Sequence, residues 1–123
     1  MGRGNYYALG DYAAQWYVEY EPDILEDAFQ EIEERFASFH KQDKWFRRDS
    51  HILLENDLFY VGIADNESTI AVFLSSKGNG TTDGLAARHF GAYEKGILDI
   101  LLSFFGEVYV PTSSWTSQKM QAI

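Results

Sequence analysis

The chain has 123 residues, of which 46% are hydrophobic and 16% aromatic, so it can build one domain with a substantial core, and the composition disfavours disorder. It has no cysteine, which excludes disulfides, thiolate metal sites and a cysteine nucleophile. The net charge of −9 disfavours direct binding to nucleic acid or anionic lipid, because phosphate recognition depends on Lys and Arg, so a basic protein partner is favoured.

The N-terminal segment gives no targeting signal. MGRGNYYALGDY lacks the apolar stretch of a secretory signal, and Tyr6 stands where an N-myristoylation signal has Ser or Thr. No apolar run approaches the roughly 20 residues that a membrane-spanning helix needs. We therefore expect a single cytoplasmic domain over residues 1–123, without membrane association.

The first elements are a strand and an amphipathic helix. Residues 12–20 alternate and are rich in aromatics, which predicts a strand. Pro22 suits a first helical turn, and a helix is expected from about 22 to 41. Apolar residues fill one arc of this helix and acids fill the opposite arc. The apolar arc comprises Ile24, Leu25, Ala28, Phe29, Ile32, Phe36 and Phe39.

The second half begins with a predicted β-meander over 51–77. Its apolar runs ILL, LFYVGIA and TIAVFL are separated by the turn sequences END and DNES. A second helix is expected from about 83 to 105, ended by Gly106 and followed by a short strand at 107–111. An extra strand or loop is expected at 45–55.

This order predicts the α+β class. We expect a two-layer sandwich in which a mostly antiparallel sheet of four or five strands carries two helices on one face, in the order β-α-β-β-(β)-α-β. Eight large side chains are expected to pack between the two layers. They are Trp16, Phe29, Ile32, Phe36, Phe73, Tyr93, Ile97 and Phe104.

Catalytic signatures are weak. The three histidines, His40, His51 and His89, have no HxH or HExxH spacing, the SSK at 75–77 is not SxxK, and the chain has no GxSxG, GxGxxG or Walker loop. We therefore expect no catalytic residue, no metal site and no cofactor, and we lean against an enzyme. His89 lies at the edge of the second helix's apolar stripe, where a half-buried packing role is expected. The alternative is a small enzyme or small-ligand binder that uses a pocket near His89.

Basic residues are concentrated in HKQDKWFRRD, residues 40–49. Basic side chains interleaved with rings can bind single-stranded nucleic acid. The patch is small, so we favour a basic loop that two aromatic rings anchor to the core. It could also attract the acidic helix, within one chain or between two. The segment contains Lys41, Lys44, Trp45, Phe46, Arg47 and Arg48.

The strongest charge feature is EYEPDILEDAFQEIEERF, residues 19–36. Eight carboxylates precede its first basic residue, Arg35, and Lys is almost absent from the i+4 positions, so like-charge repulsion goes unrelieved. Such a face can mimic the phosphates of nucleic acid, or it can simply be solvated. The candidate partner-binding residues are Asp23, Glu26, Asp27, Glu31, Glu33 and Glu34. Four of them, Glu26, Asp27, Glu31 and Glu34, are expected to be exposed and central.

Three short motifs carry a resemblance. MGRGNYY, WYVEY and SSWTS resemble pieces of small uncharacterised proteins of bacterial phages and mobile elements. The resemblance covers scattered segments and implies a bacterial accessory protein rather than a metabolic enzyme. It assigns no activity and no functional residue.

Three functional hypotheses follow. The first is a non-enzymatic inhibitor or adaptor, such as an anti-defence protein, that presents its acidic helix to a basic partner. It predicts an exposed acidic surface. The second, the ligand binder or enzyme, predicts a cavity with converging polar groups beside His89. The third is a self-associating assembly protein, a homo-oligomer, which predicts an exposed apolar patch or an open strand edge.

Overall fold

The computed structural model describes residues 12–41, 50–77, 80–111 and 120–122, and these form two helices and seven strands. The elements in chain order are β1 (Ala13–Glu19), α1 (Pro22–Arg35), β2 (His40–Lys41), β3 (Ser50–Glu55), β4 (Phe59–Asn66), β5 (Thr69–Ser76), α2 (Gly80–Phe105), β6 (Tyr109–Pro111) and β7 (Met120–Ala122).

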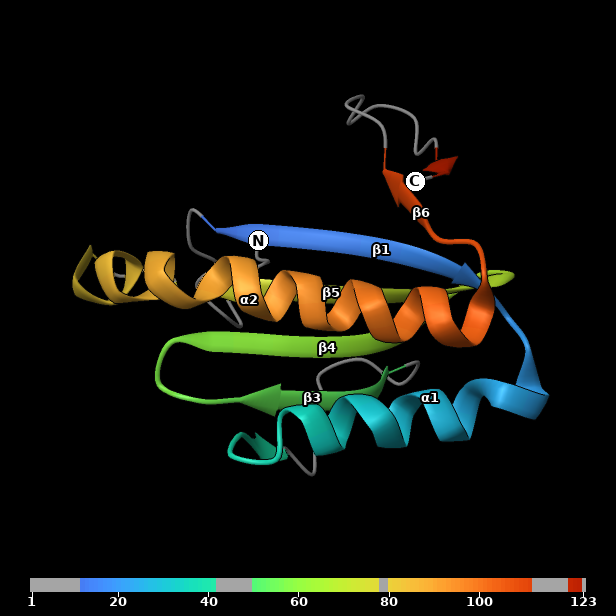
Figure 1. The fold of residues 1–123 in the computed structure, drawn as a ribbon, viewed down its shortest axis with the longest axis horizontal. Helices are drawn as coiled ribbons and strands as arrows, with labels where there is room; N and C mark the ends of the chain where they lie inside the picture. The colour runs from blue at the N-terminus through green and yellow to red at the C-terminus, as the bar shows by residue number, and fades with distance from the viewer. Residues whose placement is uncertain (1–11, 42–49, 78–79, 112–119, 123) are drawn as a thin grey trace.

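The strands form one antiparallel sheet in the order β2-β3-β4-β5-β1-β6-β7, and both helices lie on the same face of it (Figure 1). The predicted α+β two-layer class is confirmed. The sheet has more strands than the expected four or five because β2, of two residues, and β7, of three, add short pairings at its edges. Strand β1 lies inside the sheet, between β5 and β6.

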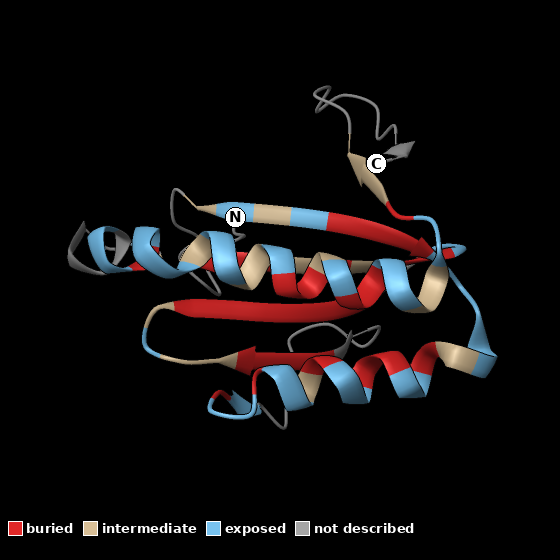
Figure 2. Ribbon diagram, viewed as in Figure 1, coloured by how far each residue is buried: buried red, intermediate tan, exposed pale blue. Residues whose placement is uncertain are grey.

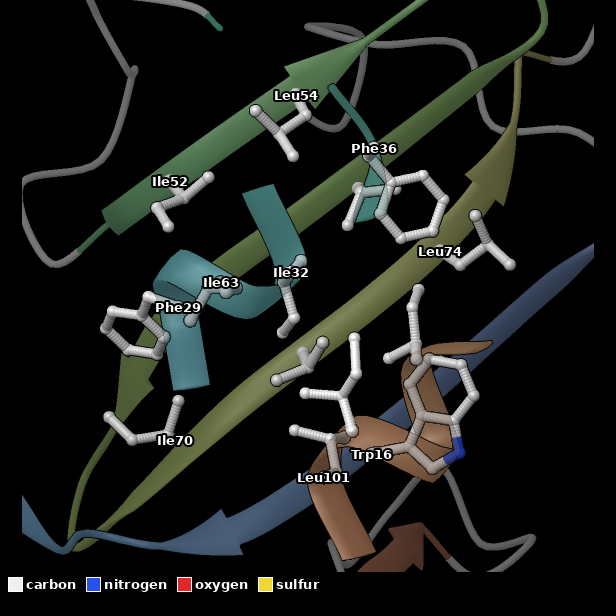
Figure 3. Packing of buried hydrophobic residues seen from close by; sticks show 14 of the residues in the cluster. Trp16, Phe29, Ile32, Phe36, Ile52, Leu54, Ile63, Ile70, Leu74 and Leu101 are labelled. Carbon is white, nitrogen blue, oxygen red and sulfur yellow. The ribbon is translucent and has the colours of Figure 1, made fainter. Parts of the chain in front are cut away.

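Alternation along the strands sends every second side chain to the helices. In β1 these are Trp16 and Val18, which pair across the strands with Val72 and Ile70 of β5. All four are buried in the main hydrophobic cluster with residues from both helices (Figures 2 and 3). Burial of these apolar faces is the main force that holds the helices on the sheet.

Most of the expected core is confirmed. Five of the eight residues belong to the main cluster, and Tyr93 and Phe104 pack against it half-buried. The five are Trp16, Phe29, Ile32, Phe36 and Ile97. The expectation for Phe73 was wrong: it alternates with Val72 and Leu74, so it points to the opposite face of the sheet. A Cβ on Gly62, its partner on β4, would meet the Phe73 ring at 2.2 Å.

Helix α1 begins at Pro22 as expected but ends at Arg35, six residues before the expected end at 41. Phe36 leaves the helical conformation at φ −110° and ψ 39°. The chain then turns, so that Phe36 and Phe39 are both buried and His40 pairs with Glu55 of β3. Ring burial and strand pairing therefore outweigh continuation of the helix.

Helix α2 ends where the sequence indicated. Gly106 has a left-handed φ of 76°, and its amide donates to the Leu102 carbonyl at 2.9 Å. Only glycine adopts this conformation without a steric cost, so Gly106 stops the helix and directs the chain into β6.

Two glycines inside α2 give a matched prediction. Gly91 is exposed and a Cβ there meets nothing within 4 Å, so Gly91→Ala should stabilise the fold by about 1 kcal/mol through helix propensity. At buried Gly96 a Cβ would lie 2.6 Å from Nη1 of Arg35, so Gly96→Ala must displace that side chain and should gain less. Urea unfolding of both variants checks this. Equal stabilisation would contradict the packing of Arg35 over α2.

Candidate functional site

The candidate site is the face of α1 that points away from the sheet. Leu25, Ala28, Phe29 and Ile32 are buried, so the 3.6-residue repeat turns the carboxylates outward. Figure 2 shows the exposed positions of α1 in pale blue. The exposed candidates are Asp23, Glu26, Asp27, Glu31 and Glu34. The expected exposure of the four central acids agrees with the structure.

Glu33 differs from the other candidates. It is half-buried, and its Oε1 lies 3.3 Å from Nζ of Lys41 on β2. The expectation that the whole face lacks neutralising partners is therefore wrong at Glu33. The contact brings the start of the basic segment to the acidic helix within one chain. Because both side chains are substantially exposed, we expect the pair to contribute at most about 1 kcal/mol.

The five exposed acids stay without ion pairs to any residue in the described parts of the chain. Glu34 accepts a hydrogen bond from Nε2 of Gln30 at 3.4 Å, one turn earlier. Arg35, the first cation after the run, lies over Gly96 of α2. The one arginine of α1 therefore lies against the neighbouring helix and does not neutralise the acids of this face.

Negative charge continues past the N-terminus of α1. Glu19 and Glu21 are exposed on either side of Tyr20, whose exposed fraction is 53%. On the adjacent strand β6 the Tyr109 hydroxyl donates a hydrogen bond to Glu107. This bond raises the pKa of Tyr109 above its ordinary 10.0, and burial and the charges of Glu107 and Glu19 raise it further.

The pKa of Tyr109 provides a test of this arrangement. The pKa of Tyr109 is higher in the folded state than in the unfolded state. The surroundings of this hydroxyl therefore stabilise the fold below about pH 10, and this stabilisation is lost as the pH rises further. Glu107→Gln removes the charge and should lower the pKa of Tyr109 towards 10.0. Glu19→Gln should lower it less. NMR titration of ring-labelled tyrosine measures both, and an unchanged pKa in Glu107→Gln would refute the contact.

The histidines do not converge in the described residues. His89 is exposed on α2, with its ring stacked on Tyr93 at 6.0 Å, so the expected half-buried role is wrong. A depression of about 540 Å³ lies nearby, and His40 lines it but His89 does not. The depression is lined by Ser38, His40, Asn56, Asp57, Leu58 and Leu85. Leu85 precedes His89 by one helical turn, so the depression is near His89 without using it.

Several residues that the sequence singled out lie outside the part of the chain that the structure describes. They are the basic positions within 42–49, including Lys44, Trp45, Phe46, Arg47 and Arg48, and the side chain of His51. Among the side chains that are described, no three of the His, Asp or Glu groups gather closely enough to hold a metal ion. Within the same residues, neither helix combines the length and apolar character that a bilayer crossing requires.

The sequence did not indicate the depression. Its walls come from three separated segments, and the turn at Asn56 was predicted only as a break between strands. The Asn56 side chain accepts hydrogen bonds from the amides of Leu58 and Phe59, each at 2.8 Å, which fixes the β3–β4 turn. The END sequence signals such a turn, but not what lies beside it in space.

Comparison with protein-family models, with curated proteins and with solved structures finds no match for this chain.

Proposed function

We propose that this protein is a non-enzymatic binding protein, an inhibitor or adaptor, that presents the acidic face of α1 to a basic protein surface. The observation that carries the proposal is the set of five exposed carboxylates on one helix, none of which has an ion pair with a described residue. Like charges this close repel one another, and a complementary cationic surface relieves the repulsion.

The packing of α1 supports this function. Four buried side chains hold the helix on the sheet, and Arg35 packs over α2. Because the backbone that carries the carboxylates is already helical, a partner binds the array without the entropic cost of forming the helix. A partner whose groove normally holds nucleic acid fits such an array, because its Lys and Arg side chains are spaced for phosphates.

An anti-defence protein of a phage or mobile element is one form of this proposal. The resemblance of MGRGNYY, WYVEY and SSWTS to proteins of such elements supports that origin. An acidic helix that occupies the nucleic-acid groove of a restriction or CRISPR protein would block it. We place the protein in the cytoplasm, where such targets act.

The experiment compares two charge variants in affinity capture from bacterial lysate. In the face variant, Glu26, Asp27, Glu31 and Glu34 become Gln or Asn. The control variant changes the same number of charges elsewhere on the protein. Its positions are Asp65, Glu67, Glu94 and Asp99. We expect the parent and the control to capture the same basic protein, and the face variant to lose it. Retention by the face variant would refute the proposal.

A further inference from the structure

The depression at the end of α1 has two apolar walls. Leu85 of α2 is large, apolar and 47% exposed, and Leu58 of the β3–β4 turn is half-buried against the core. Both line an open depression of about 540 Å³. An exposed leucine beside such a space gains hydrophobic stabilisation when an aliphatic group covers it.

The depression has one carboxylate, Asp57, among its polar lining residues, beside Ser38, His40 and Asn56. Asp57 is exposed and has no ion pair with any other residue that the structure describes. The Asn56 side chain accepts hydrogen bonds from the amides of Leu58 and Phe59, which fixes the backbone of the turn that carries Asp57. The Ser38 hydroxyl adds an acceptor within the same lining.

The depression also lies next to the acidic face. Ser38 follows Glu34, the last acid of that face, by four residues, and α1 ends between them at Arg35. A basic segment that lies along α1 therefore reaches the depression at the C-terminal end of the helix. Charge complementarity to this chain, whose net charge is −9, favours a basic occupant there too.

We propose that this depression binds an arginine side chain of the basic partner. The guanidinium pairs with Asp57, and its aliphatic stem lies between Leu58 and Leu85. Arginine fits better than lysine because its planar, weakly hydrated head pairs with carboxylates through two parallel hydrogen bonds and lies readily against apolar surfaces. This inference rests on the function proposed above and names the side chain that the partner supplies.

The test uses two synthetic peptides of equal charge, one alternating Arg with Ser and one alternating Lys with Ser, titrated calorimetrically at physiological salt. Asp57→Asn and Leu85→Ser probe the depression. Glu67→Gln and Leu102→Ser are the matched controls, since Glu67 is exposed elsewhere and Leu102 is an exposed leucine of the same helix. Circular dichroism confirms that each variant is folded.

We expect each depression variant to weaken the Arg peptide by about tenfold and the Lys peptide much less, with both controls unchanged. If the face variant loses the peptides while Asp57→Asn and Leu85→Ser bind like the parent, the arginine site is refuted and the proposed function stands. If the depression variants weaken binding and the face variant does not, the proposed function fails instead. Equal losses for both peptides would refute the selection of arginine.

Discussion

Phe36→Ala should lower the free energy of unfolding by about 3–5 kcal/mol, because it removes a large buried ring and leaves a cavity. Phe36 is 2% exposed and makes edge-on contacts with the rings of Phe39 at 5.0 Å and Tyr93 at 5.3 Å. These contacts join the end of α1 to α2. A loss of this size is a large fraction of the stability of an ordinary domain.

Urea unfolding at constant pH measures this loss. Leu102→Ala is the control, because Leu102 lies on α2 with an exposed fraction of 37% and should change stability by no more than about 0.5 kcal/mol. Phe104→Ala should have an intermediate effect, since Phe104 is only half-buried. A Phe36→Ala protein as stable as the parent would contradict the packing of the two helices on the sheet.

Gly62→Ala should also destabilise the fold, but for the opposite reason, overpacking. Gly62 is buried on β4 directly opposite Phe73 of β5, whose ring covers it. A Cβ at Gly62 would lie 2.2 Å from two ring carbons of Phe73, so the ring must move. Displacement of a packed ring typically costs about 1–3 kcal/mol.

A double-mutant cycle isolates this contact. Gly62→Ala should cost clearly less when Phe73 is already alanine, because the ring that obstructs the new methyl group is gone. Gly84→Ala is a useful control, since a Cβ there meets nothing within 4 Å. The same cost for Gly62→Ala in both backgrounds would show that the ring of Phe73 does not cover Gly62.

The sequence predicted what depends on local periodicity. The acidic and apolar arcs of α1, the start at Pro22 and the stop at Gly106 follow from spacing and backbone preferences, and the structure confirms them. The end of α1 depends on distant partners: β3, which pairs with His40, and Tyr93, against which Phe39 packs. No local pattern contains that information.

The same limit applies to the candidate site. Exposure of the acids on α1 follows from the helical repeat, and the structure agrees. The pairing of Glu33 with Lys41 depends on a turn after Arg35 that the periodicity did not indicate. The depression beside Leu85 depends on three segments that only the tertiary fold brings together.

Binding affinity as a function of salt tests the central claim most directly. The captured partner, once purified, is titrated with the parent, the face variant and the control variant at low and moderate ionic strength. We expect the face variant to bind more weakly, mainly through slower association, and with a flatter salt dependence than the other two proteins. Unchanged affinity and an unchanged salt slope in the face variant would show that the acidic side of α1 is only a solvated surface.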